Sequence, residues 1–235
     1  MTDLLSDYSF LDISFIPAVD GRKMEDSQKE KQFDYTRSLK HYGRRLNDGE
    51  VGCALSHCLC YAQLLESDNR YALILEDDIS IIRELNTIPF GKIEALLDSE
   101  KPRILFLSGD YWRLSSKQVT RVYDAVGGYA FFINRAAAQR ALSIEKPFTV
   151  ADDWMALKRL GIKLYAVFPY VIDANLEMDT LSSDVKQYSW SNNRSLMSKT
   201  EVMKTIVPGI IKRVLKGLGM FESKVRVVNN KLVGR

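Results

Sequence analysis

Short, continuous apolar runs that alternate with helical patterns constrain the fold of this chain more than any other feature. Four runs have the length of a buried strand: YALIL (71–75), RILFLSG (103–109), VGGYAFFIN (126–134) and KLYAVFPYVI (163–172). Helical patterns cover 49–66, part of 84–98, 135–142 and 151–161. Strands that are apolar throughout and separated by helices are typical of α/β layers around a parallel sheet. We therefore predict an α/β fold with a mainly parallel sheet.

The N-terminal region has weaker patterns. Residues 14–21, SFIPAVDG, predict a short strand, ISFI, that ends in a turn at Asp20 and Gly21. The polar residues 22–48 predict a long loop or a loosely packed helical stretch. The helix over 49–66 has Asn47 or Asp48 as its cap. Its predicted apolar stripe consists of Val51, Leu55, Leu59 and Ala62.

Composition and the N-terminal residues argue against export and against a membrane span. The chain is 46% apolar and 27% charged, as in ordinary globular proteins. Its first ten residues carry two acids and no basic residue, unlike a signal peptide. No apolar run approaches the roughly 18 residues that a membrane helix needs. We expect a cytoplasmic protein.

The cysteines support the same compartment. Cys53, Cys58 and Cys60 are an odd, clustered set, which makes a poor disulfide framework and suits a reducing environment. A metal site of Cys58 and Cys60 with His57 is disfavoured, because residues two apart on a helix face different ways. We expect small buried core cysteines.

The positive charge is concentrated at the C-terminus. The chain carries a net charge of +3, and residues 199–235 contain nine Lys or Arg and two acids. We therefore separate a catalytic body, 1–198, from a basic tail, 199–235. Within the tail, residues 204–218 predict an amphipathic helix. Two interpretations are open: a helix that lies on an anionic membrane surface, or one that docks on the body with its basic residues in water.

Acidic residues follow the first predicted strand. Glu76, Asp77 and Asp78 come directly after YALIL, and Asp110 follows the second strand. In parallel sheets, ligands gather where strands end. A Glu-x-Asp spacing on an extended segment points residues 76 and 78 to one side, where they could hold Mg²⁺ or Mn²⁺. The competing interpretation is a solvated strand exit.

Three further features carry weaker signals. Asp152 and Asp153 precede a helix, where they could cap it or act as a general base, and Trp154 could offer a flat surface to a sugar ring or pack in the core. Gly127, Gly128 and Tyr129 could admit a ligand close to the backbone or form a bulge or turn. His57 could act in catalysis or pair with a polar group of the core.

Several blocks together resemble one family. The segments AVDG (18–21), GEVGCALSH (49–57), ALILEDD (72–78) and GGYAFFI (127–133) look like conserved blocks of glycosyltransferase family 25. This family contains bacterial lipooligosaccharide galactosyltransferases and related animal collagen galactosyltransferases. Asp153 falls where the family has an acidic block, and SSD (182–184) resembles its late polar segment. The resemblance extends over residues 14–185.

The resemblance implies a GT-A-like, Rossmann-type nucleotide-sugar-binding domain and an inverting transfer. The implied partners are a UDP-sugar donor, usually UDP-galactose, and a lipid-linked oligosaccharide acceptor at the inner face of the bacterial inner membrane. The implied cofactor is Mn²⁺ or Mg²⁺. No nucleic acid is expected. The implied roles are metal binding by Asp78 and Glu76, and proton abstraction by Asp153, with Asp152 second. Donor-binding residues are Glu50, Ser56, His57, Glu76, Asp77, Gly128 and Tyr129.

One departure from the family pattern keeps other functions open. Family members usually begin with a strand and an Arg pair before the AVDG block, whereas this chain begins with MTDLL, which predicts the following helix. That strand normally contributes to the nucleotide site. Either the true start lies upstream of this sequence, or the chain is a truncated form, so an inactive nucleotide- or glycan-binding module is an alternative. A metal-dependent phosphohydrolase would use the same carboxylates to activate water.

Overall fold

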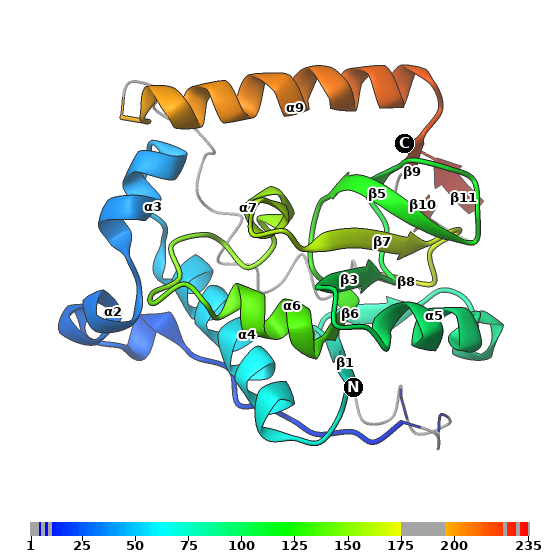
Figure 1. Ribbon diagram of the computed structural model, residues 1–235, viewed down its shortest axis with the longest axis horizontal. Helices are drawn as coiled ribbons and strands as arrows, with labels where there is room; N and C mark the ends of the chain where they lie inside the picture. The colour runs from blue at the N-terminus through cyan, green and yellow to red at the C-terminus, as the bar shows by residue number, and fades with distance from the viewer. Residues whose placement is uncertain are drawn as a thin grey trace.

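The computed structural model describes residues 5, 8, 11–174, 196–222, 225–228 and 231–234. Its centre is a seven-stranded sheet (Figure 1). The strands follow the order β1 (Tyr71–Leu75), β6 (Ala130–Asn134), β3 (Arg103–Phe106), β7 (Lys163–Val167), β5 (Val119–Ala125), β4 (Tyr111–Arg113) and β9 (Phe221–Glu222). Two small sheets pair β2 (Ile79–Ile81) with β8 (Ile172–Ala174), and β10 (Val225–Val228) with β11 (Lys231–Gly234).

The prediction of a mainly parallel sheet is wrong. In the central sheet, β3 pairs with β7 in parallel, and the other pairs of neighbouring strands are antiparallel. Because β6 lies antiparallel between β1 and β3, these two outer strands run the same way as β7. The start of β6 therefore lies at the same edge as the ends of β1 and β3. This edge carries the candidate site.

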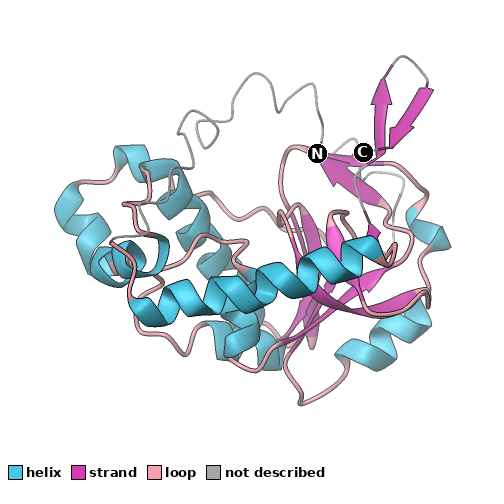
Figure 2. Cartoon of the chain, turned by 90° about the horizontal axis from the view of Figure 1, so that it is seen from above, coloured by secondary structure: helices cyan, strands magenta, loops and turns pink. Residues whose placement is uncertain are grey.

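The central strands are apolar along their whole length because both faces of the sheet are covered. Ile104 and Phe106 point into one core cluster, whereas Leu105 and Leu107 point into the other. The first cluster includes residues of α4 (Asp48–Glu66) and α6 (Arg135–Ala141). The second includes residues of α5 (Phe90–Leu97) and of the 3-10 helix η2 (Leu85–Thr87). Figure 2 shows the strands gathered on one side of the molecule and several helices on the other.

Residues 14–48 differ from their prediction. The segment ISFI belongs to no strand, and a 3-10 helix, η1 (Gly21–Lys23), follows it. The stretch expected to be loose contains α2 (Asp26–Gln32) and α3 (Tyr35–Tyr42). Phe33 and Leu46 are almost fully buried against Val51 and Leu55 of α4. These few apolar side chains, spaced without a clear period, converge only in three dimensions.

Helix α4 begins as predicted. The Asn47 side chain accepts a hydrogen bond from Glu50 N (2.8 Å), and the Glu50 carboxylate accepts one from Asn47 N (2.9 Å). This reciprocal capping satisfies two backbone groups that the helix itself cannot pair. The predicted apolar stripe is wrong at Leu59, which is 44% exposed, whereas Tyr61 and Leu64 are buried. The sheet contacts a neighbouring face of the helix.

Later elements are present but shorter than predicted. The strand expected from residue 126 starts at Ala130, and the helix expected from 151 is α7 (Trp154–Arg159). The run 163–172 divides into β7 and the start of β8, with Pro169 between them after a cis peptide bond. Proline lacks the N–H that a central strand needs, so the division falls where the sequence pattern placed a strand end.

The basic tail contains a long helix, α9 (Lys199–Gly217), as predicted. It lies along the top of the molecule in Figure 1, and Ser198 N at its start donates to Lys40 O (3.1 Å). Pro208 lies inside it and has no N–H to donate to the Lys204 carbonyl one turn earlier. That carbonyl instead accepts a long hydrogen bond from Arg159 (3.5 Å). None of the helices in the described part of the chain is both long and apolar enough to cross a membrane.

The AVDG segment fits against α4 at very short range. Val19 N donates to the Ser56 hydroxyl (2.8 Å), which in turn donates to Gly52 O (2.8 Å). A Cβ on Gly21 would lie 2.0 Å from Asp48 O, and one on Gly52 would lie 2.4 Å from Val19 O. Backbone meets backbone here, so neither position has room for a side chain.

We predict that Gly21→Ala lowers the free energy of unfolding by about 1–3 kcal/mol or more, because the backbone must separate to admit a methyl group. Gly91→Ala is the matched control, since its Cβ would have nothing within 4 Å and it lies in α5. That change should be neutral or slightly stabilising. Urea unfolding of both variants measures the difference, and equal stabilities would contradict the close approach.

Candidate functional site

Three predicted site residues lie together where β1 ends and β6 starts: Glu76, Gly128 and Tyr129. Glu76 N donates to Tyr129 O (2.9 Å), which extends the β1–β6 pairing past both strands. A Cβ on Gly128 would lie 3.2 Å from the Trp154 ring, 3.6 Å from a Glu76 carboxylate oxygen and 3.7 Å from Asp152 Cβ. Gly128 therefore lies, buried, at the point where Glu76, Asp152 and Trp154 converge. Trp154 is 1% exposed and packs in the core, so it offers no flat surface to a sugar ring.

Asp152 belongs to this cluster through Gly127. Its carboxylate accepts a hydrogen bond from Gly127 N (3.1 Å), while Gly127 O accepts one from the Trp154 indole (2.9 Å). Burial raises the pKa of Asp152, and the negative charges of Glu76 and Asp153 add to this effect against the hydrogen bond from Gly127. A carboxylate with a raised pKa binds a proton more readily, as a general base must.

Asp153 is engaged differently. One carboxylate oxygen accepts hydrogen bonds from Tyr42 (2.8 Å) and His41 (2.9 Å), and the other accepts one from Ala156 N (2.9 Å) at the start of α7. Burial would raise the pKa of Asp153, but the hydrogen bond and charge of His41, together with the other donors, lower it. Asp153 therefore caps α7 and holds α3, and its low proton affinity suits positioning better than proton abstraction.

His41 extends this contact to the C-terminal helix. Its second ring nitrogen lies 2.8 Å from the Glu201 carboxylate in α9. The ring is only 11% exposed and packs edge-on against Tyr42 and Phe148. The row Asp153–His41–Glu201 thus links α7, α3 and α9. Sequence analysis missed His41, which stands in a polar stretch with no motif around it.

The acidic segment 76–78 is not extended, so the argument that its alternate carboxylates share one side does not apply. The chain turns at Asp77 and Asp78 before β2. Glu76 and Asp78 are half-buried, and Asp77 is exposed. Glu76 and Asp78 nevertheless both act on Cys53, because their charges contribute to raising its pKa. They remain the candidate oxygen ligands for a hard cation.

A second set of possible ligands shares Glu76. Ligand atoms of Cys53, His57 and Glu76 lie within 4.8 Å of one another. His57 is 6% exposed, stacks on the Phe131 ring, and lies 3.4 Å from the Glu76 carboxylate. Among the described residues its Nδ1 has no hydrogen-bond partner. Loss of solvent around the Cys53 thiol, and second the negative charge of Glu76, raise the pKa of Cys53 to about 12. A metal would therefore have to displace the thiol proton.

The cysteines correct one expectation. Cys53 is exposed, and Cys58 and Cys60 are partly exposed, so they are not buried core residues. The set that could bind a metal combines Cys53 with His57 rather than Cys58 and Cys60 with it. The separation of four residues puts Cys53 and His57 on one helix face. That spacing was visible in the sequence, but the approach of Glu76 was not.

Two predicted donor-binding residues have clear structural partners. Glu50 is 5% exposed and pairs with both guanidinium nitrogens of Arg44 (2.8 and 2.5 Å) in addition to capping α4. Ser56 joins the AVDG segment to α4. Glu50 and Ser56 thus make structural contacts, at the start of α4 and at the AVDG segment. The SSD segment at 182–184 lies outside the described residues.

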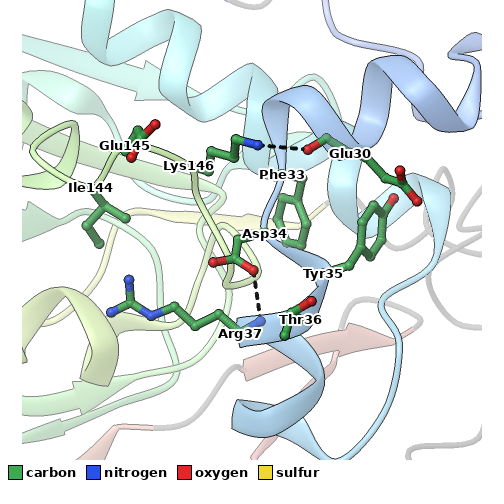
Figure 3. Close-up of a pocket in the computed structure, with 9 residues that line it drawn as sticks. All are labelled: Glu30, Phe33, Asp34, Tyr35, Thr36, Arg37, Ile144, Glu145 and Lys146. Atoms are coloured by element: carbon green, nitrogen blue, oxygen red, sulfur yellow. Dashed lines mark hydrogen bonds between the residues drawn. The ribbon is translucent and has the colours of Figure 1, made fainter.

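A broad hollow of the described surface lies elsewhere. It has a volume of about 670 Å³ and is open to solvent between α2, α3 and residues 144–146 (Figure 3). Lys146 donates to Glu30 O (3.0 Å) across it, and Asp34 accepts from Arg37 N (2.9 Å). None of the predicted site residues lines it. The candidate site is therefore the point where Glu76 and Asp152 converge on Gly128, with the pKa of Asp152 raised by burial.

A comparison with known families identifies the family of this chain. Residues 7–156 match the family described as "Glycosyltransferase family 25 (LPS biosynthesis protein)". The chain belongs to glycosyltransferase family 25. The matched range contains η1, α4, the acidic segment 76–78, Gly128 and both aspartates before α7. The segments that build the candidate site therefore lie inside this range.

Individual relatives cover shorter regions. A glycosyltransferase 25 family member of Aedes aegypti is 35% identical over 72 residues, and one of Anopheles gambiae is 36% identical over 75 residues. A Haemophilus influenzae protein, named provisionally as a glycosyltransferase, is 37% identical over 67 residues. These alignments cover 28–29% of this chain, 12% of the mosquito proteins and 23% of the Haemophilus protein.

We expect substitutions of the two neighbouring aspartates to have different effects on the free energy of unfolding. We predict that Asp153→Asn lowers the free energy of unfolding by about 1–3 kcal/mol at neutral pH, because a buried charged acceptor is lost. Because the pKa of Asp153 is lowered in the folded state, its ionisation stabilises the fold at pH values above 3.8, the ordinary pKa of an aspartate. This stabilisation is lost as the pH falls through the lower pKa of the folded state. The difference from wild type should therefore shrink in acid.

Asp152→Asn is the matched control. The raised pKa of Asp152 means that ionisation of this carboxyl is unfavourable in the folded state. The variant should therefore be as stable as wild type, or more stable, at neutral pH. Urea titrations over a pH series measure both variants. Equal losses for the two would contradict the division of roles.

Proposed function

We propose that this protein is an inverting glycosyltransferase that transfers galactose from UDP-galactose to a lipooligosaccharide or lipopolysaccharide acceptor. The observation that carries the proposal is the convergence of Glu76 and Asp152 on Gly128 at one sheet edge of a family 25 chain. A nucleotide-sugar site needs carboxylates that can face a bound ligand, and Glu76 and Asp152 are both partly exposed beside the buried Gly128 and Trp154.

Mn²⁺ or Mg²⁺ is the proposed cofactor. Glu76 and Asp78 offer carboxylate oxygens, the donors that these hard cations take together with substrate phosphates. Both side chains are half-buried and flank the turn at Asp77, so their donor chemistry fits such an ion. When bound, the ion would neutralise charge on the leaving UDP. Asp77, exposed beside them, is the proposed donor contact.

Asp152 is the proposed general base in this mechanism, in preference to Asp153. The acceptor hydroxyl attacks the anomeric carbon, the bond between that carbon and UDP breaks, and the hydroxyl proton passes to the Asp152 carboxylate. The raised pKa of Asp152 favours this transfer. Asp153, next to it, positions Asp152 by fixing the start of α7 against His41 and Tyr42.

The Cys53–His57–Glu76 set provides a competing metal preference. Thiolate and imidazole ligands favour Zn²⁺, whereas the carboxylates favour Mn²⁺ or Mg²⁺. In the proposed function His57 holds Glu76 in place through their 3.4 Å contact. Activity that is supported by Zn²⁺ and lost in Cys53→Ser would assign the metal to the thiol set instead.

The proposed acceptor is lipid-linked, which would place the enzyme in the cytoplasm at the inner face of a bacterial membrane. The family description, which names LPS biosynthesis, supports this acceptor class. The preference for galactose comes from the resemblance of the sequence blocks to family 25 galactosyltransferases. No nucleic-acid partner is proposed.

The test is donor turnover with a panel of UDP-sugars, with Mn²⁺ and with EDTA. We expect turnover of UDP-galactose that EDTA abolishes and that Asp78→Ala removes, while Asp68→Ala, an exposed acid in the α4–β1 turn, leaves it unchanged. Asp152→Asn should lower kcat by about 100-fold or more. The rate should fall as pH drops through the raised pKa of Asp152, where the base becomes protonated.

Three outcomes would contradict the proposal. Folded protein that neither binds nor turns over any UDP-sugar would exclude the transferase. Turnover that is unaffected by EDTA and by Asp78→Ala would exclude the metal. A large loss of activity in Asp153→Asn, with full activity in Asp152→Asn, would move the base to Asp153.

A further inference from the structure

The outer face of α9 is an exposed apolar stripe. Met203, Ile206, Val207, Ile210, Val214 and Leu218, spaced at one, three or four residues, are between 46% and 66% exposed. Steps of three and four residues keep side chains on one face of a helix. Scattered exposed apolar residues are ordinary, but six on one continuous face mark an interaction surface.

The opposite face fixes the helix so that this stripe points outward. Lys212 forms an ion pair with Asp124, which is 4% exposed, and its ammonium group lies 4.6 Å from the centre of the Trp112 ring. Leu215 is 8% exposed, and Glu201 contacts His41 (2.8 Å). To bury its apolar stripe against the body, α9 would have to turn over and leave Asp124 charged and unpaired, or protonated. Burial already raises the pKa of Asp124.

Basic side chains border the stripe. Lys204, which pairs with Glu201, follows one edge, and Arg213 follows the other, and both residues are exposed. Lys216 lies farther round the helix, with its ammonium group 5.5 Å from the centre of the Phe221 ring. Helix α9 as a whole carries five basic residues and one acid. A second copy of this chain would bring equal positive charges together along both borders, which opposes pairing of two such faces. An anionic surface meets both the charges and the apolar side chains.

We infer that the outer face of α9 is a membrane-binding surface, on which the helix lies in the plane of an anionic lipid bilayer. The apolar stripe enters the boundary between headgroups and acyl chains, and Lys204 and Arg213 contact lipid phosphates. Of the two interpretations of the basic tail, docking of α9 on the body is observed, and the lipid-binding face is the inferred part. The inference depends on α9 alone and does not require the proposed transferase activity.

The experiment is co-sedimentation of the whole chain with vesicles. We expect binding to vesicles that contain phosphatidylglycerol, below about 0.1 M salt where screening is weak, and much weaker binding to pure phosphatidylcholine. Ile210→Ser with Val214→Ser should abolish binding, because both side chains are more than half exposed and form the centre of the stripe. Arg213→Glu should weaken binding at least about fivefold.

The matched control is Leu59→Ser with Ile82→Ser, which removes comparable exposed apolar side chains from α4 and from the segment after β2 (44% and 39% exposed). It should bind vesicles as wild type does. Circular dichroism of each variant establishes that the fold is retained.

The inference is overturned if wild type does not bind anionic vesicles at low salt, or if the stripe variant binds as well as the control. It is also overturned if light scattering shows a dimer that the stripe variant dissociates, since the face would then bind a second copy. Vesicle binding without UDP-sugar turnover would contradict the proposed function only, and turnover without vesicle binding would contradict this inference only.

Discussion

The carboxylate of Asp153 is the contact on which the rest of the site depends. It is 14% exposed and accepts hydrogen bonds from α3 and from the start of α7, and its partner His41 reaches Glu201 in α9. A buried carboxylate is costly unless its oxygens are paired, so these elements must assemble together around it. Its neighbour Asp152 is thereby held beside Gly127, and α9 is held with one face outward.

The candidate site forms at one edge of the sheet although the sheet is mainly antiparallel. Ligands collect at the carboxyl ends of parallel strands, and β1 and β3 do run the same way. The antiparallel β6 between them contributes its beginning rather than its end. Gly127 and Gly128, which precede β6, therefore lie beside Glu76 at the end of β1. A fully parallel arrangement would have placed the start of β6 at the opposite edge.

Helix α9 has two faces with different environments. Its inner face is polar and specific, with Lys212 on Asp124 and Glu201 on His41, whereas its outer face is apolar and bordered by charge. Most amphipathic helices of globular proteins place these faces the other way round. The polar anchors set the direction of the stripe, and they connect the surface helix to residues next to the candidate base.

The sequence by itself determined the order of most elements, the cap of α4, the helix in the basic tail and the acidic segment after β1. These features depend on local propensity, capping and short-range periodicity, all of which a linear pattern records. Strand direction, the packing of α2 and α3, and the contacts of His41, Cys53 and the two aspartates were decided by the tertiary structure. Each depends on contacts between residues far apart in the chain: His41 and Asp153 are 112 positions apart and hydrogen-bonded. No periodicity records such a contact, because burial and pairing arise only when the elements pack.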